Sequence, residues 1–501
     1  MSEDLNENTS LDEDSDVKEL ERFGYKQQLH RTMGSYTSFS LAFSMITITT
    51  TIFTLFAQPF QTIGGAAIWL WIPATVGVLL IGLVYSHLSA RLPVTGYAYQ
   101  WSSRLVSPHF GWFTGWNAML ATFIGSAGIA VAFATVFAPD FWSNPSHQDV
   151  ELLAAIAIIL ATAVNVVSIK VASRVNNVGA TFELVGTIGL SMALAVGLFF
   201  FRHHQGLSIL TTIKPTIKGS PVNLTTIGIA LLLPVYTLAG WEGSADLAEE
   251  TRDPRAVAPK AMLRSIVVSG VAAFFVYAVF ALAIKGSVSA TVNETSANPL
   301  VSIFASRFGT FMGDLLQFVA FVAIFSALIA NIAVATRTGF SLARDDMIPA
   351  SKFWRNVNAK TGTPIATVLL VGLVALIVNL LSAGLAARVT AIVAVVVYLT
   401  YGSSLLAVLI GIKNGSIPEA PKRYFGLKDS LKPITVVAIL WSVIVILYMT
   451  LPAVNQVGGE YTVYAEIIGF IWYFALLRGR LNRGEAGPKN LSVDMESDRS
   501  L

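Results

Sequence analysis

The chain has 501 residues, of which 54% are hydrophobic and 13% are charged, with a net charge of +3 at pH 7 and no cysteine. A soluble globular chain typically carries about 25% charged residues, so this composition excludes an ordinary soluble domain and predicts a membrane protein. The lack of cysteine excludes disulfides, thiolate metal sites and cysteine nucleophiles.

A tail precedes the first membrane segment. Residues 1–34 are predicted to form a disordered cytoplasmic tail, because the first 30 residues are polar and acidic and lack the apolar core of a signal peptide. Twelve apolar segments follow, each of the roughly 20 residues or more that a spanning helix needs. These predicted spans 1 to 12 cover residues 35–60, 64–90, 108–138, 149–169, 175–201, 222–245, 259–286, 311–342, 361–382, 386–413, 431–452 and 459–478. Residues 479–501 are predicted to form a cytoplasmic C-terminal tail.

The basic residues indicate one orientation for these spans. If both termini are cytoplasmic, the inner segments hold 27 of the 33 Lys and Arg residues. The outer segments hold the other six, which are Arg202, Lys214, Lys218, Lys285, Arg307 and Arg388. Because inner loops of membrane proteins are enriched in Lys and Arg, this distribution favours twelve spans with both termini inside.

Several acidic residues fall within the spans. Glu183 lies in span 5, Glu242 in span 6 and Glu466 in span 12, while Asp246 lies at the cytoplasmic end of span 6. Intramembrane carboxylates are costly and usually face a cavity or a partner. They are therefore candidate functional residues.

Two spans contain helix-weakening residues at corresponding places. Span 1 has five threonines within residues 47–54, and span 6 contains Pro234, Gly240 and Gly243. The two spans correspond if residues 35–201 and 222–413 are five-helix repeats and residues 431–478 form two peripheral helices. A matched pair of interrupted helices indicates a secondary transporter with an inverted repeat. The alternative is a kinked span 1 whose hydroxyls bond back to its own carbonyls.

Five motifs give the chain a family resemblance. They are residues 93–99 (PVTGYAY), 111–116 (GWFTGW), 174–177 (RVNN), 240–254 (GWEGSADLAEETRDP) and 343–349 (ARDDMIP). The chain resembles the amino acid–polyamine–organocation (APC) transporters, and within them the amino acid/GABA/choline permease branch. The resemblance implies an all-α, leucine-transporter-like fold with a 5+5 inverted-repeat core and two peripheral helices. It also implies a substrate site between unwound parts of spans 1 and 6, with help from spans 3, 8 and 10.

Three positions depart from the pattern of the resembled family. Span 1 has Thr50-Thr51-Ile52 where many members have a Gly-Ser-Gly-like break, so side-chain hydroxyls replace some backbone freedom. Span 6 has Trp241-Glu242 after the glycine, where this branch commonly has Tyr or Phe followed by Asp. Glu183 stands where proton-coupled members often place a Lys, which argues against a simple lysine switch.

The predicted substrate site combines both breaks. It comprises Thr47, Thr49, Thr50, Thr51, Tyr236, Gly240, Trp241 and Glu242. Glu183 and Glu242 are predicted to couple protons, and Asp246, Ser326 and Asn331 are secondary or gating candidates. Structural alternatives are a bridging role for Glu183, a helix cap for Glu242 and core packing for Trp241.

Other residues are predicted to have structural roles. Tyr97, Tyr99 and Trp101 are predicted to lie in the inner loop and membrane interface rather than in the site. The spacing of Gly111 and Gly115 favours close helix packing. The acidic residues after span 6, which are Glu249, Glu250 and Asp253, are predicted to pair with nearby basic residues.

The predicted function is import of amino acids or GABA-like amines across the plasma membrane by alternating access, driven by protons or by exchange. Alternatives are transport of a carboxylate-free cation such as choline, ethanolamine or a polyamine, and a nutrient sensor that moves no solute. We find no metalloprotease, hydrolase or P-loop motif, so no enzyme is predicted. No cofactor, metal site or nucleic-acid partner is predicted, and the expected contacts are the substrate, protons and membrane lipids.

Overall fold

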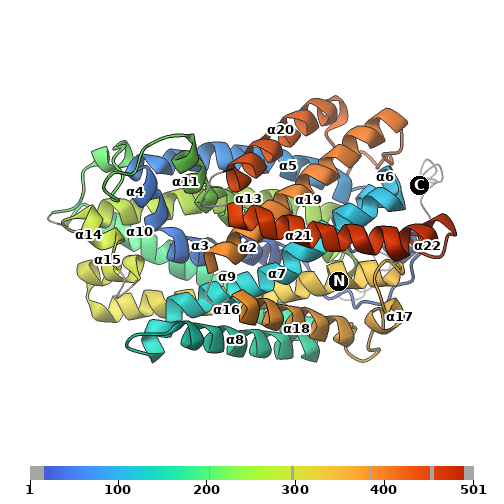
Figure 1. Ribbon diagram of the computed structural model, residues 1–501, viewed down its shortest axis with the longest axis horizontal. Helices are drawn as coiled ribbons and strands as arrows, with labels where there is room; N and C mark the ends of the chain where they lie inside the picture. Colours follow the sequence, from blue (N-terminus) through green and yellow to red (C-terminus); the bar gives the residue numbers. More distant parts are fainter. Residues whose placement is uncertain (1–15, 202, 295–297, 383–385, 452–455, 490–501) are drawn as a thin grey trace, which may run out of the picture.

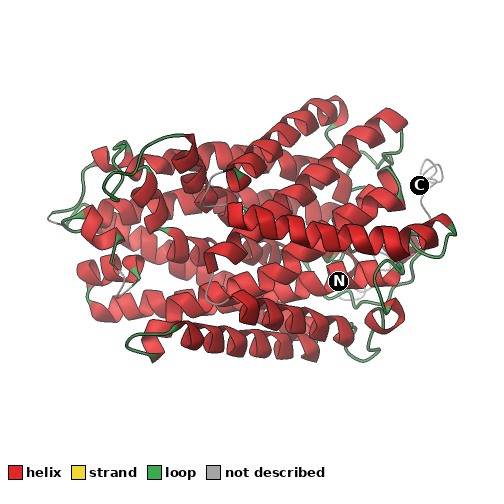
Figure 2. Ribbon diagram, viewed as in Figure 1, coloured by secondary structure: helices red, strands yellow, loops and turns green. Residues whose placement is uncertain are grey.

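The computed structural model describes residues 16–201, 203–294, 298–382, 386–451 and 456–489. This part of the chain is helical and contains no strand, only two isolated β-bridges (Figure 2). Long helices run side by side, with α6, α17 and α22 at one end of the bundle and α4, α14 and α15 at the other (Figure 1). Helices suit these apolar sequences because each one satisfies its own backbone hydrogen bonds, which lipid cannot do.

Each predicted span coincides with a helix or a broken helix. The helices are α2 (Ser35–Ile46), α3 (Ile48–Leu55), α4 (Ala57–Thr62), α5 (Trp71–Ser89), α6 (Tyr97–Leu105), α7 (Pro108–Phe141), α8 (His147–Val167), α9 (Ile169–Thr181), α10 (Gly189–Gly197), α11 (Leu224–Thr237), α12 (Gly243–Asp246), α13 (Pro254–Ala283), α14 (Val288–Val292), α15 (Pro299–Phe308), α16 (Thr310–Arg344), α17 (Ser351–Trp354), α18 (Ile365–Ser382), α19 (Ala386–Asn414), α20 (Leu431–Thr450), α21 (Gln456–Trp472) and α22 (Arg478–Asn482). A π-helix joins α9 to α10, and the 3₁₀-helix η4 (Ala248–Glu250) follows α12.

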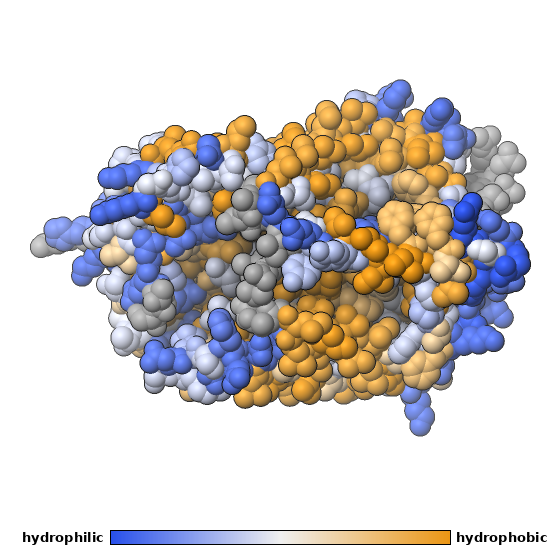
Figure 3. Space-filling model, viewed as in Figure 1, coloured by the Kyte–Doolittle hydropathy of each residue, from blue (hydrophilic) through white to orange (hydrophobic). Residues whose placement is uncertain are grey.

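Ten helical stretches of the described chain are long and apolar enough to cross a membrane. Predicted spans 6 and 9 contain shorter apolar helices, α11 and α18. Large hydrophobic side chains such as Ile159, Leu440 and Ile471 are exposed on the outside of the bundle. Figure 3 shows apolar side chains over the middle of the molecule and hydrophilic ones at its ends. Such a surface suits lipid contact, so the chain is a multi-pass membrane protein.

The close packing predicted for the GxxxG spacing is confirmed. A methyl group on Gly111 would collide with Ser103, and one on Gly115 would lie 2.9 Å from the Tyr99 Cβ. Both contacts join α7 to α6, a buried helix in a region predicted to be an inner loop. The two glycines therefore hold α6 against the core.

The break in span 1 is shorter than the sequence suggests. Only Thr47 leaves the helix, with φ 46° and ψ 65° in the left-handed region, whereas Thr49, Thr50 and Thr51 belong to α3. The Thr51 hydroxyl bonds back to the Thr47 carbonyl at 3.2 Å, and the Thr54 hydroxyl to that of Thr50 at 2.7 Å. A break and back-bonded hydroxyls therefore occur together, and hydroxyl bonds of this kind favour a bend in the helix that follows the break.

The break in span 6 is wider. Helix α11 ends at Thr237 and α12 begins at Gly243. Gly240 lies between them with φ 98°. A left-handed conformation of this kind strongly favours glycine.

Candidate functional site

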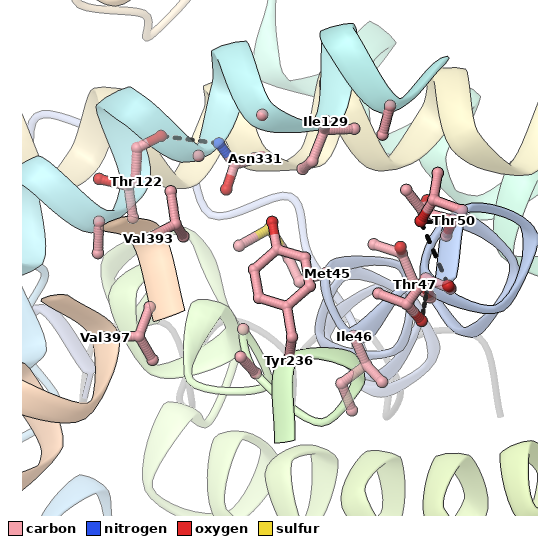
Figure 4. A pocket seen from close by; sticks show the side chains of 18 of the residues that line it. Met45, Ile46, Thr47, Thr50, Thr122, Ile129, Tyr236, Asn331, Val393 and Val397 are labelled. Atoms are coloured by element: carbon pink, nitrogen blue, oxygen red, sulfur yellow. Dashed lines mark hydrogen bonds between the residues drawn. The ribbon is translucent and has the colours of Figure 1, made fainter. Parts of the chain in front are cut away.

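A cavity of about 250 Å³ lies between the two broken spans. Its walls come from α2, α3, α7, α11 and the chain between α11 and α12, α16 and α19, and the first residue of α6. Ile129, Val393 and Val397 make part of the wall apolar, and Tyr236 projects into the middle (Figure 4). Thr47 and Thr50 lie on the side of the cavity opposite Val393 and Val397. The cavity therefore has an apolar side and a hydroxyl-rich side.

The two breaks are in direct contact. A Cβ at Gly240 would lie 2.9 Å from the carbonyl oxygen of Met45, the second residue before the span 1 break. The Thr237 hydroxyl donates to that of Thr51 at 2.7 Å. Glycine at position 240 thus allows the backbone of span 6 to approach span 1, in a conformation that other residues adopt only with strain.

Among the described residues that line the cavity, Glu242 is the one charged residue. It is 7% exposed, and the Tyr401 hydroxyl donates to its Oε2 at 2.8 Å. No Lys, Arg or His belongs to the described cavity lining. One carboxylate without a basic partner suits an ammonium group, to which carbonyls of the broken helices can also bind.

The hydroxyl-rich side lies at the start of α3. Thr47, Thr50, Thr51 and Thr54 all line the cavity, and the buried Thr50 Oγ1 has no hydrogen-bond partner in the described chain. The first N–H groups of a helix lack intrahelical partners and favour an anion. This end of the cavity therefore suits a carboxylate.

Asn331 of α16 fixes the neighbouring wall. Its amide nitrogen donates to the Thr122 carbonyl and to the Ser126 hydroxyl of α7, both at 2.8 Å. Its amide oxygen points away from Thr122 into the cavity (Figure 4). Asn331 therefore joins two helices and also offers the cavity an acceptor.

Glu183 lies behind α3 rather than in the cavity lining. It is 2% exposed, and its Oε1 accepts a hydrogen bond from the Thr49 N–H at 2.9 Å. The Thr49 hydroxyl is 3.0 Å from that of Thr187. Glu183 and Thr187 belong to the π-helix at residues 182–188, and such irregular turns are frequent at functional sites. The Glu183 carboxyl group thus accepts a hydrogen bond from one of the N–H groups at the start of α3 that have no partner within the helix.

Thr49, which was predicted to bind the substrate, also lies outside the cavity lining, and so do three further sequence-predicted residues. Trp241 is fully buried and stacks on Tyr401 with ring centroids 5.5 Å apart. Asp246 accepts hydrogen bonds from the Gly96 N–H and the Thr338 hydroxyl, both at 2.7 Å. The third is Ser326, described next.

Ser326 packs against another helix. Its hydroxyl donates to the Ala323 carbonyl at 3.0 Å, and a methyl group on Gly179 of α9 would collide with it. In this structure, Trp241, Asp246 and Ser326 hold elements around the cavity rather than facing it.

Tyr97 lies in the cavity lining, although the sequence predicted it outside the site. It directly follows Gly96, whose φ of 91° lets α6 begin beneath the cavity. Tyr97 packs with Trp101 and Tyr85, and Tyr85 in turn contacts Tyr401. These rings close the cavity toward the end where α6 lies. The motif at residues 93–99 was the one sequence feature that could have placed Tyr97 at the site, and no sequence feature pointed to Tyr401.

Beyond the rings, two buried ion pairs join η4 to α16. Arg337 binds Glu250 at 2.6 Å, and Arg344 binds Glu249 at 2.9 Å. Burial raises the pKa of Glu250, and Arg337 opposes that shift. The predicted pairing is confirmed for Glu249 and Glu250, whereas Asp253 forms no ion pair with a described residue. The described chain contains no group of three potential metal ligands.

Sequence comparison identifies the family. A profile described as amino acid permease matches residues 34–473. The chain belongs to the amino acid permease family. This permease is similar to amino-acid permease BAT1 of Arabidopsis thaliana, with 23% identity over 91% of the chain and 92% of that protein. It is also similar to amino-acid permease 2 of Neurospora crassa, with 24% identity over 94% and 88%.

A third relative has a different name. The low-affinity putrescine importer PlaP of Escherichia coli is 26% identical over 61% of this chain and 65% of that protein. The family match includes every residue that lines the cavity, from Met45 to Thr400. The permease also has described residues outside the match, at 16–33 and 474–489.

Proposed function

We propose that this permease is a secondary active transporter that imports amino acids or GABA-like amines across the plasma membrane by alternating access. The observation that carries the proposal is the cavity between two touching helix breaks, with Glu242 as its one charged residue. Family membership supports a transported solute with an amine. The framework is twelve spans with both termini cytoplasmic, built from repeats 35–201 and 222–413.

In this proposal the substrate lies between the two breaks. Its amine binds Glu242 and the carbonyls between α11 and α12, because a buried carboxylate favours a cation. Its carboxylate binds the hydroxyls of Thr47 and Thr50 and the free N–H groups at the start of α3. Tyr236 and the apolar wall cover the rest of the solute.

Glu183 and Glu242 are the proposed proton-coupling groups. Both are buried carboxyls with specific partners, the Thr49 N–H and the Tyr401 hydroxyl respectively. Glu183 stabilises the start of α3 when it is charged, because a helix N-terminus favours negative charge. Protonation would weaken that contact and so connect proton binding to the half-helix beside the substrate.

A carboxylate-free cation is the second candidate substrate. The described part of the cavity lining contains an acid and no base, and one relative is named a putrescine importer. At the end of the cavity proposed to bind an anion, the break carries the side chain of Thr47 rather than a more freely moving glycine backbone. Choline, ethanolamine or a polyamine would then bind through Glu242 alone.

Uptake by purified protein in liposomes tests these proposals. The panel contains labelled amino acids, GABA, choline and putrescine, each with and without an inward proton gradient. Accumulation of an amino acid or GABA that grows with the gradient supports the first proposal. Uptake of choline or putrescine alone supports the second. Binding without any uptake would instead make the chain a sensor.

A further inference from the structure

Residues 16–33 precede the family match and pack on the end of the bundle where α6 lies, so this part of the predicted disordered tail is folded, while residues 1–15 lie outside the described residues. The segment begins with a short helix at residues 16–22. Leu20, Phe23, Leu29 and Met33 are buried, each no more than 2% exposed. Apolar burial on this scale holds the segment in a defined place, since each such side chain contributes about 1.5–3 kcal/mol.

The segment pairs with the backbone that follows α12. The N–H groups of Thr32 and Met33 donate to the Glu250 carbonyl at 3.1 and 2.9 Å, and the Arg252 N–H donates to the Met33 carbonyl at 3.0 Å. Met33 and Thr251 thereby form a parallel β-bridge. This backbone pairing holds residues 32–33 against the chain that carries the two buried ion pairs.

Tyr25 contacts Arg344, the basic partner of Glu249, and the neighbouring Asp345. Its hydroxyl donates to the Asp345 carboxylate at 2.8 and 2.9 Å, and the centroid of its ring lies 3.6 Å from the Arg344 guanidinium carbon. Burial and Asp345 raise the pKa of Tyr25, so the hydroxyl stays a donor. Arg344 also binds Glu249, whose Oε1 accepts from the Thr95 N–H at 3.1 Å.

A single segment therefore joins three elements that close the inner end. It bonds to the chain after α12 through Glu250 and to the end of α16 through Asp345. It bonds to α6 as well, because Arg104 donates to the Phe23 carbonyl at 3.2 Å. Opening the cavity toward this end requires these elements to separate, and each contact of the segment opposes that separation.

We propose that residues 16–33 are an intramolecular latch that binds the inner closed face through Tyr25 and the Met33–Thr251 pairing and must detach for the inner end to open. This inference rests on the proposed function, because only a transporter needs that end to open. The partner surface is η4 with Thr251, the end of α16 and α6. Release of the latch then limits how often the inward-open state is reached.

A disulfide at the β-bridge tests the latch. The natural chain has no cysteine, so the double variant Met33→Cys/Thr251→Cys contains only the introduced pair. Residues opposite each other in a β-bridge lie close enough for a disulfide. We expect oxidation to reduce liposome uptake at least about tenfold and a reducing agent to restore it, since one conformation is locked.

The matched control is Asn358→Cys/Thr363→Cys, the other isolated β-bridge, which closes a local loop. Its uptake should not change on oxidation. Full uptake by the cross-linked Met33/Thr251 variant, with cross-linking verified by mass spectrometry, would overturn the latch. Absence of uptake by the unmodified protein across the whole substrate panel would instead overturn the proposed function.

Tyr25→Phe gives a second test that does not depend on cross-linking. Asp345 keeps hydrogen bonds from Tyr99 and Gln100, both at 2.9 Å, so the fold should persist. A single cysteine at Thr251, which is fully buried, should react with maleimide about tenfold faster when Tyr25→Phe is present, because a bond to a charged group is lost. Lys26→Ala is the control, since the exposed Lys26 side chain forms no ion pair in the described chain. Equal reaction rates in all three backgrounds would count against the latch.

Discussion

Glu242 gives the cavity its charge, and its replacement tests the proposed amine site. Glu242→Gln keeps the shape and an acceptor for Tyr401 but removes the negative charge. Hydrogen bonds to charged groups contribute about 1.5–3 kcal/mol, so we expect uptake efficiency to fall about 10- to 100-fold. Concentration-dependent uptake in liposomes measures this loss. Tyr401→Phe is the control, because it removes the 2.8 Å hydrogen bond and leaves the charge, and its loss should be several times smaller.

Glu183 lies outside the cavity, and its replacement tests coupling separately from binding. Glu183→Gln is neutral at every pH, but its amide oxygen can still accept from the Thr49 N–H. We expect substrate exchange to persist while the stimulation of uptake by an inward proton gradient disappears. The matched control is Glu466→Gln, which neutralises an intramembrane acid on α21, a helix at the periphery of the bundle. Uptake by Glu183→Gln that keeps the parent pH dependence would remove Glu183 from the coupling mechanism.

At the scale of elements, the contact between the two breaks depends on a single glycine. Gly240→Ala would place a Cβ 2.9 Å from the Met45 carbonyl oxygen in addition to the strain of φ 98°. We expect loss of most transport, because the breaks must move apart. Gly309→Ala has a comparable φ of 92° but open space around the new Cβ. It should cost only the backbone strain of about 1–2 kcal/mol and keep transport, which uptake and thermal unfolding together would measure.

The sequence predicted the positions of the helices better than their interruptions. Long apolar runs locate α5, α7 and α16 because lipid demands continuous helix there. The break in span 1 narrows to Thr47, since the hydroxyls of Thr51 and Thr54 bond to helix carbonyls. Whether a threonine bonds to its own helix or faces a ligand depends on neighbouring helices, and the sequence alone does not contain that information.

The residues of the cavity likewise divide into those that local sequence predicts and those that long-range packing places. Two of its acceptors follow from local patterns, since Glu242 lies next to a break and Asn331 is a polar residue in an apolar span. Tyr97 was misplaced because it lies on α6, whose mixed composition resembles a loop. Packing against other parts of the chain, including the close approach at Gly111 and Gly115, buries that helix and brings its first residue to the cavity. Site residues that are brought together by such long-range packing can be identified from the structure but not from the sequence alone.

At the scale of the whole molecule, the surface and the charge distribution lead to one arrangement in the membrane. The apolar belt leaves the end with α6, α17 and α22 on one side of the bilayer (Figures 1 and 3). That end carries Arg337, Arg344 and the loop between α19 and α20, whereas α14 and α15 lie at the other. Because basic loops stay in the cytoplasm, the closed, latched end should face the cell interior.

Single cysteines in the otherwise cysteine-free chain test this orientation. Lys218 precedes α11 and Lys422 precedes α20, and both side chains are exposed. In intact cells, a membrane-impermeant maleimide should label Lys218→Cys at once and Lys422→Cys only after permeabilisation, because twelve spans put the two loops on opposite sides. Labelling of both sites in intact cells would contradict the twelve-span arrangement. The reverse pattern would place the latch outside, where its release would control loading of the cavity rather than delivery of the substrate.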